Sequence, residues 1–334
     1  MLFRRSLLSA LPIFSAGLAL AARWGRAAEI SAATGTNPGF SGFLAGIWAE
    51  ARLSGVSPAT LNRALSGLQP NPRVVELDRS QPEFTITWQR YRRTRVSPAR
   101  IARGQAMFRR YREVLEAVQA RYGVDPGVIL AIWGLESDYG ADSGGFSVVE
   151  ALATLAFEGR RAAMFRRELI AALQIVDHGD VPLNEMLGSW AGAMGQPQFM
   201  PSVYQRYAVD FTGKGRRDIW NDTADVLASI ANYLAQSGWQ PGQPWGLEVR
   251  PPADDNAETL LGRSMEGSEW RQIGFTTPAG EPVPALSAPL RLLLPEGAAG
   301  QAFLVGPNFN AIRAYNPSDF YALAVGLLAD RVAA

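Results

Sequence analysis

The sequence contains no cysteine and a single histidine, and both scarcities exclude classes of chemistry. Without cysteine there is no disulfide, cysteine nucleophile, thiolate metal site or lipid-modified N-terminal cysteine. One histidine cannot build a zinc site of several histidines. That residue, His178, lies in D-H-G-D, which predicts a solvated or capping position at a helix end rather than part of a serine–histidine–aspartate device. The phosphate-binding pattern G-x-x-x-x-G-K-[ST] is also absent.

Charge and hydropathy bear on the partners and the location of the protein. The 334 residues carry a formal net charge of +1, so nothing indicates nucleic acid as a partner. One long apolar run, Leu7–Ala22, follows Arg4-Arg5 and precedes small residues up to Ala28, which is the layout of a signal peptide. We expect export of the chain with removal of residues 1–28, by the ordinary secretory or the twin-arginine route. The mature protein should be soluble, outside the cytoplasm and without a membrane anchor.

The stretch A-I-W-G-L-E-S-D-Y-G, residues 131–140, has Glu136 at its centre. Asp125 and Pro126 are helix-start signals, and Gly140 is a stop signal. The run before Glu136 is nearly all apolar, which predicts a buried helix. Glu136 continues the spacing of that packed face. Burial and the negative end of a helix dipole both favour a protonated carboxylic acid, which is what a general acid needs.

The mechanism should work with one carboxylate. Asp138 does not pair with Glu136, because residues two apart on a helix point in different directions. The chain also has 9 Trp, 9 Tyr and 15 Phe, and its loops carry Gln, Asn and Ser. Aromatic faces and hydrogen-bonding side chains together suit a carbohydrate. The alternative for each feature alone is ordinary, namely a solvated glutamate and core aromatics.

Periodicity predicts an α+β protein, mostly helical, with a small β insertion near the C-terminus. Helices are expected at 37–68, 85–95, 98–122, 147–157, 161–177, 222–237 and 318–331. Strands are expected at 247–249, 290–294 and 302–305. The domains follow as a helical domain over 37–125 joined by 308–334, a core over 126–242 and a β domain over 243–307.

Two irregular stretches lie in the core. Residues 191–207 are rich in Gly, Pro and Gln, and buried loops of that kind tend to bind ligands. The segment that starts at Asp210 resembles part of a calcium loop, in which Thr212 would take a second ligand position. Lys214, the only lysine, places a cation where the third ligand should be an oxygen. Its ammonium could itself occupy the place of the metal charge, so we expect neither calcium nor another cofactor.

The combined motifs resemble the lytic murein transglycosylase B family, glycoside hydrolase family 103. The most specific matches are G-L-E-S-D-Y-G at 134–140, G-S-W-A-G-A-M-G at 188–195 and Q-F-M-P-S at 198–202. Further matches are Q-P-E-F at 81–84, Y-G-V at 122–124, D-F at 210–211, A-N-Y at 231–233, and R-A-Y-N at 313–316 with Tyr321. They appear in order from about residue 40 to the end.

The resemblance implies a lysozyme-like catalytic core over 126–242 that cleaves the β-1,4 bond between N-acetylmuramic acid and N-acetylglucosamine in peptidoglycan. Glu136 would protonate the glycosidic oxygen. As a base it would then help the C6 hydroxyl of the same muramoyl residue attack C1, which leaves a 1,6-anhydro end. One carboxylate is enough for this sequence of steps, whereas most glycosidases need two.

The same motif matches imply the surroundings of Glu136. Ser189 and Gln198 would hydrogen-bond the substrate or the glutamate, and Met194 would form part of the sugar-binding wall. The groove would be lined by Tyr91, Tyr233, Tyr315, Asn316 and Tyr321. The family's calcium loop is matched at Asp210 and Asp225, but not at Lys214.

The expected partners are peptidoglycan glycan strands in the periplasm, with cell-wall synthases as further candidates. Two alternatives stay open at this point. One is a hydrolase on the same fold, which would use water and leave a reducing end. The other is a non-catalytic peptidoglycan-binding scaffold.

Overall fold

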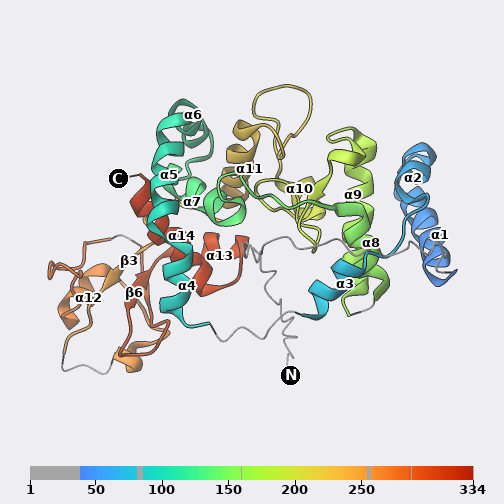
Figure 1. Ribbon diagram of the computed structural model, residues 1–334. Helices are drawn as coiled ribbons and strands as arrows, with labels where there is room; N and C mark the ends of the chain where they lie inside the picture. Colours follow the sequence, from blue (N-terminus) through green and yellow to red (C-terminus); the bar gives the residue numbers. More distant parts are fainter. Residues whose placement is uncertain (1–37, 81–85, 159, 254–256, 287, 334) are drawn as a thin grey trace, which may run out of the picture. The chain divides into compact units, whose positions relative to one another are not determined.

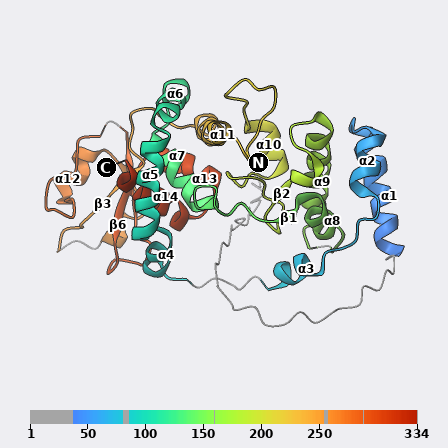
Figure 2. The same ribbon diagram turned by 45° about the horizontal axis from the view of Figure 1, so that its top comes forward.

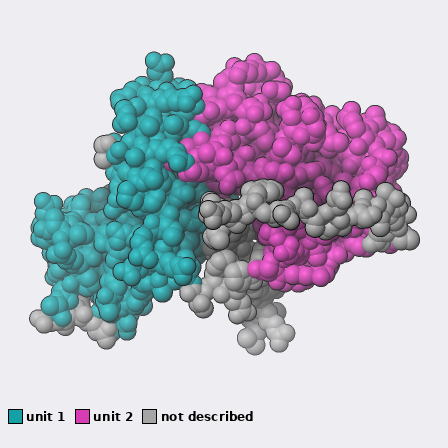
Figure 3. Space-filling model, viewed as in Figure 1, with its two compact units in different colours: residues 1–14, 85–135, 230–334 teal, residues 15–84, 136–229 magenta. Residues whose placement is uncertain are grey.

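The computed structural model describes residues 38–80, 86–158, 160–253, 257–286 and 288–333. The chain forms two compact units, which Figure 3 shows in different colours. Within the described residues, unit 1 holds 86–135 and 230–333, and unit 2 holds 38–80 and 136–229. The boundaries fall inside two helices, α7 (Pro126–Ser137) and α11 (Thr223–Gln236). The signal peptide expected at 1–28 and the Q-P-E-F motif at 81–84 lie outside the described residues.

Unit 2 is mostly helical and is built around α9, which packs along α8 and also contacts α1, α2 and α10. Its helices are α1 (Pro38–Leu53), α2 (Pro58–Leu65), α3 (Pro72–Arg79), α8 (Val148–Glu158), α9 (Ala162–His178) and α10 (Pro201–Tyr207), with a short 3-10 helix at Leu183–Glu185 (Figure 1). Local signals set the helix starts. Ser57 accepts the N–H of Thr60, Asn71 accepts that of Val74, and a proline follows each cap.

A short antiparallel pair lies beside these helices. Strand β1 (Phe146–Ser147) pairs with β2 (Leu187–Gly188), with Phe146 opposite Gly188. Figure 2 shows the pair next to α8, which β1 contacts. The pairing brings together the chain that follows α7 and the chain that follows α9.

Unit 1 is organised around α14, whose residues from Tyr321 to Ala329 are all buried. This helix packs against α4, α5 and α13. The helices of unit 1 are α4 (Trp88–Arg95), α5 (Pro98–Arg110), α6 (Arg112–Tyr122), α12 (Gly267–Ile273), α13 (Pro307–Tyr315) and α14 (Asp319–Val332), together with the first part of α7. Figure 1 shows α4 and α5 following one another beside α14.

Unit 1 also contains a small antiparallel sheet, in the order β3-β6-β5-β4. The strands are β3 (Gly246–Val249), β4 (Ser264–Met265), β5 (Leu290–Leu293) and β6 (Ala302–Val305). Its own core contains Trp270 and Phe275, whose rings meet edge to face at 5.0 Å. Trp88 joins this sheet to the helices, because its ring contacts Phe303 on one side and Phe320 on another.

The predicted α+β class is confirmed, and β3, β5 and β6 lie where strands were expected. The short strands β1, β2 and β4 were not expected. The helix expected at 98–122 is wrong in one respect, because it breaks at Tyr111 into α5 and α6. α10 lies inside the stretch expected to be irregular, since Pro201 begins a helix at its first position. The division into three domains stays a prediction. In the described chain no helix has the length and hydropathy that a membrane span requires.

Candidate active site

Glu136 lies in the last turn of α7. Asp125 caps that helix as predicted, with its Oδ1 accepting the N–H of Gly127 at 2.7 Å. Every residue from 127 to 135 is buried, and Glu136, which follows them, is partly exposed. The sequence therefore delivers one carboxylate from a rigid, buried helix to the edge of solvent.

The backbone turns sharply after Glu136. The helix ends at Ser137 and not at Gly140, because Asp138 and Tyr139 adopt left-handed φ angles of 52° and 60°. Residues with a side chain rarely adopt that conformation, and each such residue costs about 1–2 kcal/mol. The turn is fixed by Ser137, whose Oγ accepts the N–H of Gly140 and whose carbonyl accepts that of Asp142. Held strain of this kind clusters at functional sites.

The segment after this turn packs against the 187–199 loop. Gln198 reaches back to it, with its Nε2 donating to the carbonyl oxygens of Ser143 at 2.9 Å and Gly195 at 2.7 Å. Gln198 also has a left-handed φ of 53°. Gly144 lies so close to Gly188 that a Cβ atom on Gly144 would collide with the Gly188 carbonyl. The structure thus ties the chain that follows Glu136 to the predicted binding loop.

The 187–199 loop is held by its own backbone. Met194 pairs with both Gly188 and Phe199, and Ser189 donates its N–H to the carbonyl of Ala193 at 2.8 Å. The Ser189 Oγ accepts the N–H of Ala193, so its hydroxyl hydrogen can still donate to another group. Met194 is fully buried inside the loop, and its predicted contact with a sugar stays a prediction.

The remaining predicted groove residues belong to unit 1. Tyr233 donates its hydroxyl to the carbonyl of Ala314 at 2.6 Å, and its ring lies 4.8 Å from that of Tyr315. Asn316 and Tyr321 are buried where α13 passes into α14. Tyr91 is also buried, in an aromatic cluster with Trp88 and Phe320. Unit 1 therefore brings Tyr233 against Tyr315, which precedes Asn316 in the chain, and places Tyr321 in the first turn of α14.

In the 210–225 loop, Asp210 and Asp225 accept backbone N–H groups, and the absence of calcium stays a prediction. Asp210 accepts the backbone N–H groups of Lys214 and Gly215, at 3.0 and 2.7 Å. Asp225 is fully buried and accepts three more, from Phe211, Thr212 and Asp218. Burial raises the pKa of Asp225 above its ordinary value, although these hydrogen bonds oppose the rise. Within the described residues, no three carboxylate or imidazole groups gather at metal-binding spacing.

Sequence reasoning missed the residue that Lys214 contacts. The Lys214 ammonium lies 2.5 Å from Oδ2 of Asp222, which also accepts the Thr212 hydroxyl at 3.1 Å. Burial opposes the charge on Asp222, but hydrogen bonds from Lys214 and from the N–H of Ala224 outweigh it and hold its pKa below its ordinary value. Asp222 was expected only as the start of a helix, and its capping position was the available signal.

A second ion pair, between Asp180 and Arg217, anchors the same loop at the end of α9. Arg217 Nη2 lies 2.6 Å from Oδ2 of buried Asp180, and its guanidinium covers the Tyr204 ring at 4.8 Å. Burial would raise the pKa of Asp180, but the hydrogen bonds from Arg217 hold it below its ordinary value. His178 ends α9 with an exposed side chain, 3.2 Å from Asp180, as its predicted solvated position requires.

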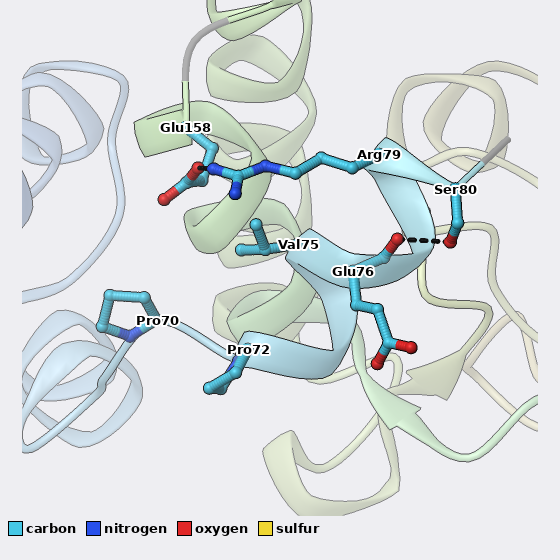
Figure 4. A pocket seen from close by; sticks show the side chains of 7 residues that line it. All are labelled: Pro70, Pro72, Val75, Glu76, Arg79, Ser80 and Glu158. Atoms are coloured by element: carbon cyan, nitrogen blue, oxygen red, sulfur yellow. Dashed lines mark hydrogen bonds and ion pairs between the residues drawn. The ribbon is translucent and has the colours of Figure 1, made fainter.

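A hollow of about 670 Å³ lies on unit 2 between α3 and the end of α8. Figure 4 shows it, with Arg79 paired to Glu158 at 2.8 Å. None of the predicted site residues lines it.

Comparisons with known proteins decide the family. Residues 39–330 match the model of the transglycosylase SLT domain. The chain belongs to this family. It is 37% identical over 251 residues to the membrane-bound lytic murein transglycosylase B of Escherichia coli K12, an alignment that covers 74% of this chain and 67% of that protein.

Solved structures agree. SltB3 from Pseudomonas aeruginosa, in complex with NAG-anhNAM-pentapeptide, superposes with a TM-score of 0.84 at 48% identity, over 87% of this chain and 78% of that one. The E. coli lytic transglycosylase Slt35, in complex with calcium, superposes with a TM-score of 0.70 at 33% identity, over 89% and 93%. The predicted family and its lysozyme-like transglycosylase fold are therefore confirmed.

Proposed function

We propose that this protein is a lytic transglycosylase of peptidoglycan in which Glu136 acts first as the acid and then as the base. The observation that carries the proposal is the place of Glu136, the single half-exposed carboxylate at the end of a buried helix, followed by a strained turn. The SltB3 relative has been solved with both a NAG-NAM-pentapeptide and its anhydro counterpart, which are substrate-like and product-like ligands.

The reaction divides into two proton transfers. In the first, the Glu136 carboxyl gives its proton to the glycosidic oxygen, and the bond from that oxygen to C1 of the muramoyl residue breaks. In the second, the Glu136 carboxylate takes the proton of the C6 hydroxyl while O6 forms a bond to C1. Glu136 ends protonated as it began, and no water is consumed. Since the attacking hydroxyl belongs to the sugar being cleaved, the second step has the advantage of an intramolecular reaction.

The loop residues have positioning roles in this proposal. Ser189 has a hydroxyl hydrogen to donate towards the substrate. Gln198 donates its amide N–H groups to the carbonyl oxygens of Ser143 and Gly195. Its role in the proposal is therefore to hold the 187–199 loop against the segment after Glu136. Tyr233, Tyr315 and Asn316 would supply the ring faces and amide that a glycan strand requires.

Export to the periplasm belongs to the same proposal. It is supported by the signal-peptide pattern of residues 1–28 and by a substrate that lies outside the cytoplasmic membrane. Glycan strands are the proposed partner, and cell-wall synthases remain candidates as protein partners.

Digestion of purified sacculi tests the proposal. Glu136→Gln should lower the release of muropeptides by about 10³-fold or more, because one side chain performs both proton transfers. Glu185→Gln is the matched control, the same substitution at an exposed glutamate, which should keep at least about a third of the activity. Pelleting with sacculi should show that Glu136→Gln still binds. Full activity of Glu136→Gln would disprove the proposed role.

A further inference from the structure

The 210–225 loop uses its carboxylates on its own backbone. Asp210 and Asp225 together accept five backbone N–H groups, all within 3.4 Å. Asp222 caps α11 through Oδ1, which accepts the N–H groups of Ala224 and Asp225. Each of these three side chains therefore has a structural task that needs no bound ion.

Of the oxygens of Asp210, Asp222 and Asp225, Oδ2 of Asp222 is the one that accepts from side chains. Its partners are the Thr212 hydroxyl and the Lys214 ammonium. The Asp222 side chain is 10% exposed, whereas that of Lys214 is 62% exposed. The positive charge of Lys214 thus reaches from solvent to the almost buried carboxylate of Asp222. The two donors to this oxygen, Thr212 and Lys214, both belong to the calcium-like pattern that starts at Asp210.

Calcium does not fit this arrangement. Ca²⁺ takes six to eight oxygen ligands at about 2.3–2.6 Å. Position 214 offers an ammonium, which has three donors and no lone pair, and it lies on an oxygen that a metal would need. A related protein, Slt35 of E. coli, was solved in complex with calcium.

We propose that the Lys214 ammonium replaces the metal charge in this loop, so that the protein folds and works without calcium. The loop then keeps one positive charge next to Asp222, but supplies it from the chain. Chelators and changes in free Ca²⁺ should leave the protein unaffected, unlike a protein in which an ion completes the same loop.

Thermal unfolding of the full-length mature protein tests this directly. The Tm of the wild type should change by less than about 1 °C between 5 mM EDTA and 10 mM CaCl₂, since a ligand stabilises only a protein that binds it. The control is MgCl₂ at equal ionic strength. A wild-type Tm that rises by several degrees in CaCl₂ and falls in EDTA would overturn the proposal.

Substitutions at position 214 provide the converse test. Lys214→Asp restores an oxygen ligand, and should lower the Tm in EDTA and raise it by about 3 °C or more in 10 mM CaCl₂. Lys214→Asn is the second variant, in case added negative charge prevents folding. Lys214→Met is the matched control, without charge or oxygen, and should lose stability that calcium does not restore. If neither Asp nor Asn gains a response to calcium, Lys214 is not what takes the place of the ion.

The single lysine allows a direct view of the ammonium. In protein labelled with isotopic lysine, all side-chain lysine signal comes from Lys214. Its chemical shift should stay constant when CaCl₂ is added, and its pKa should lie above that of free lysine, because Asp222 hydrogen-bonds it. Displacement of the signal by CaCl₂ would contradict the proposal.

Discussion

Two irregular loops of unit 2 are held in their conformations by different interactions. The 187–199 loop is fixed by backbone pairing and close glycine contacts, and its residues from 191 to 195 are all buried. The 210–225 loop is fixed by carboxylates that accept backbone N–H groups, and its residues from 212 to 216 are all exposed. In the first loop, added side-chain atoms at Gly188 or Gly192 would collide with neighbouring atoms. In the second, an exposed ammonium, that of Lys214, pairs with an almost buried carboxylate, that of Asp222.

The difference bears on function. In the proposed mechanism, the 187–199 loop, which packs against the segment after Glu136, must hold its atoms within a fraction of an ångström, and dense backbone packing achieves this. The 210–225 loop needs only to be folded, and hydrogen bonds to carboxylates allow more variety in how that is done. Substitutions in the two loops should therefore differ in size of effect.

The largest effect is expected for Gly188→Ala. Its Cβ atom would collide with the carbonyl oxygen of Ala193, a backbone atom that cannot move without breaking the loop. We expect a loss of about 3 kcal/mol or more in unfolding free energy, together with loss of sacculus digestion. Gly145→Ala is the control, with no atom within 4 Å of its Cβ position. Denaturant unfolding of both variants decides, and equal stabilities would contradict the account.

The next effect is expected for Asp225→Ala, which leaves three backbone N–H groups without their acceptor. The expected loss is about 2–4 kcal/mol, since a buried unsatisfied donor costs about 1–3 kcal/mol. Asp225→Asn keeps one of the two oxygens and should lose roughly half as much. A wild-type unfolding curve for Asp225→Ala would show that these hydrogen bonds do not hold the loop.

A smaller effect is expected for Gly213→Ala. This glycine has a left-handed φ of 71°, but its Cβ would meet no atom within 4 Å, so only backbone strain opposes the change. The expected loss is about 1 kcal/mol, and Gly213→Asn should recover part of it because Asn tolerates that conformation. If Gly213→Ala were as damaging as Gly188→Ala, the contrast between the loops would fail.

The smallest effect is a dependence on pH. Because the pKa of Asp222 is lowered in the folded protein, its contribution to stability is complete above the unfolded pKa of about 3.9 and is lost as pH falls through the folded value. Between pH 5 and 3 the wild-type Tm should fall about 1–3 °C further than that of Asp222→Asn, whose amide still caps α11. Parallel plots of Tm against pH for the two proteins would show that the Asp222 carboxylate does not contribute to this stability.

The sequence predicted what local signals determine. The helix that carries Glu136 followed from Asp125, Pro126 and an apolar run. Strands β3, β5 and β6 followed from short apolar segments between Pro- and Gly-rich turns, whereas the two-residue strand β4 was missed. The break at Tyr111 was missed, because no Gly or Pro marks it and the periodic pattern continues across it. Capping and periodicity act over a few residues, so they carry over from sequence to structure.

Tertiary partners could not be predicted in the same way. The Lys214–Asp222 pair depends on how the 210–225 loop folds back, and the anchoring of Gln198 to Ser143 joins segments 55 residues apart. The calcium-like pattern singled out Asp210, Thr212 and Asp225, and any role of these residues in metal binding stays a prediction. It did not show that Asp222 would be the residue that receives the lysine.

The most direct test of the central claim is digestion of sacculi in water enriched in heavy oxygen, followed by mass spectrometry of the muropeptides. Single-carboxylate catalysis through Glu136 predicts anhydro products, about 18 Da lighter than hydrolysed ones and free of the heavy isotope, since the C6 hydroxyl attacks C1. Reducing-end products that carry heavy oxygen would contradict it, because water would then be the nucleophile.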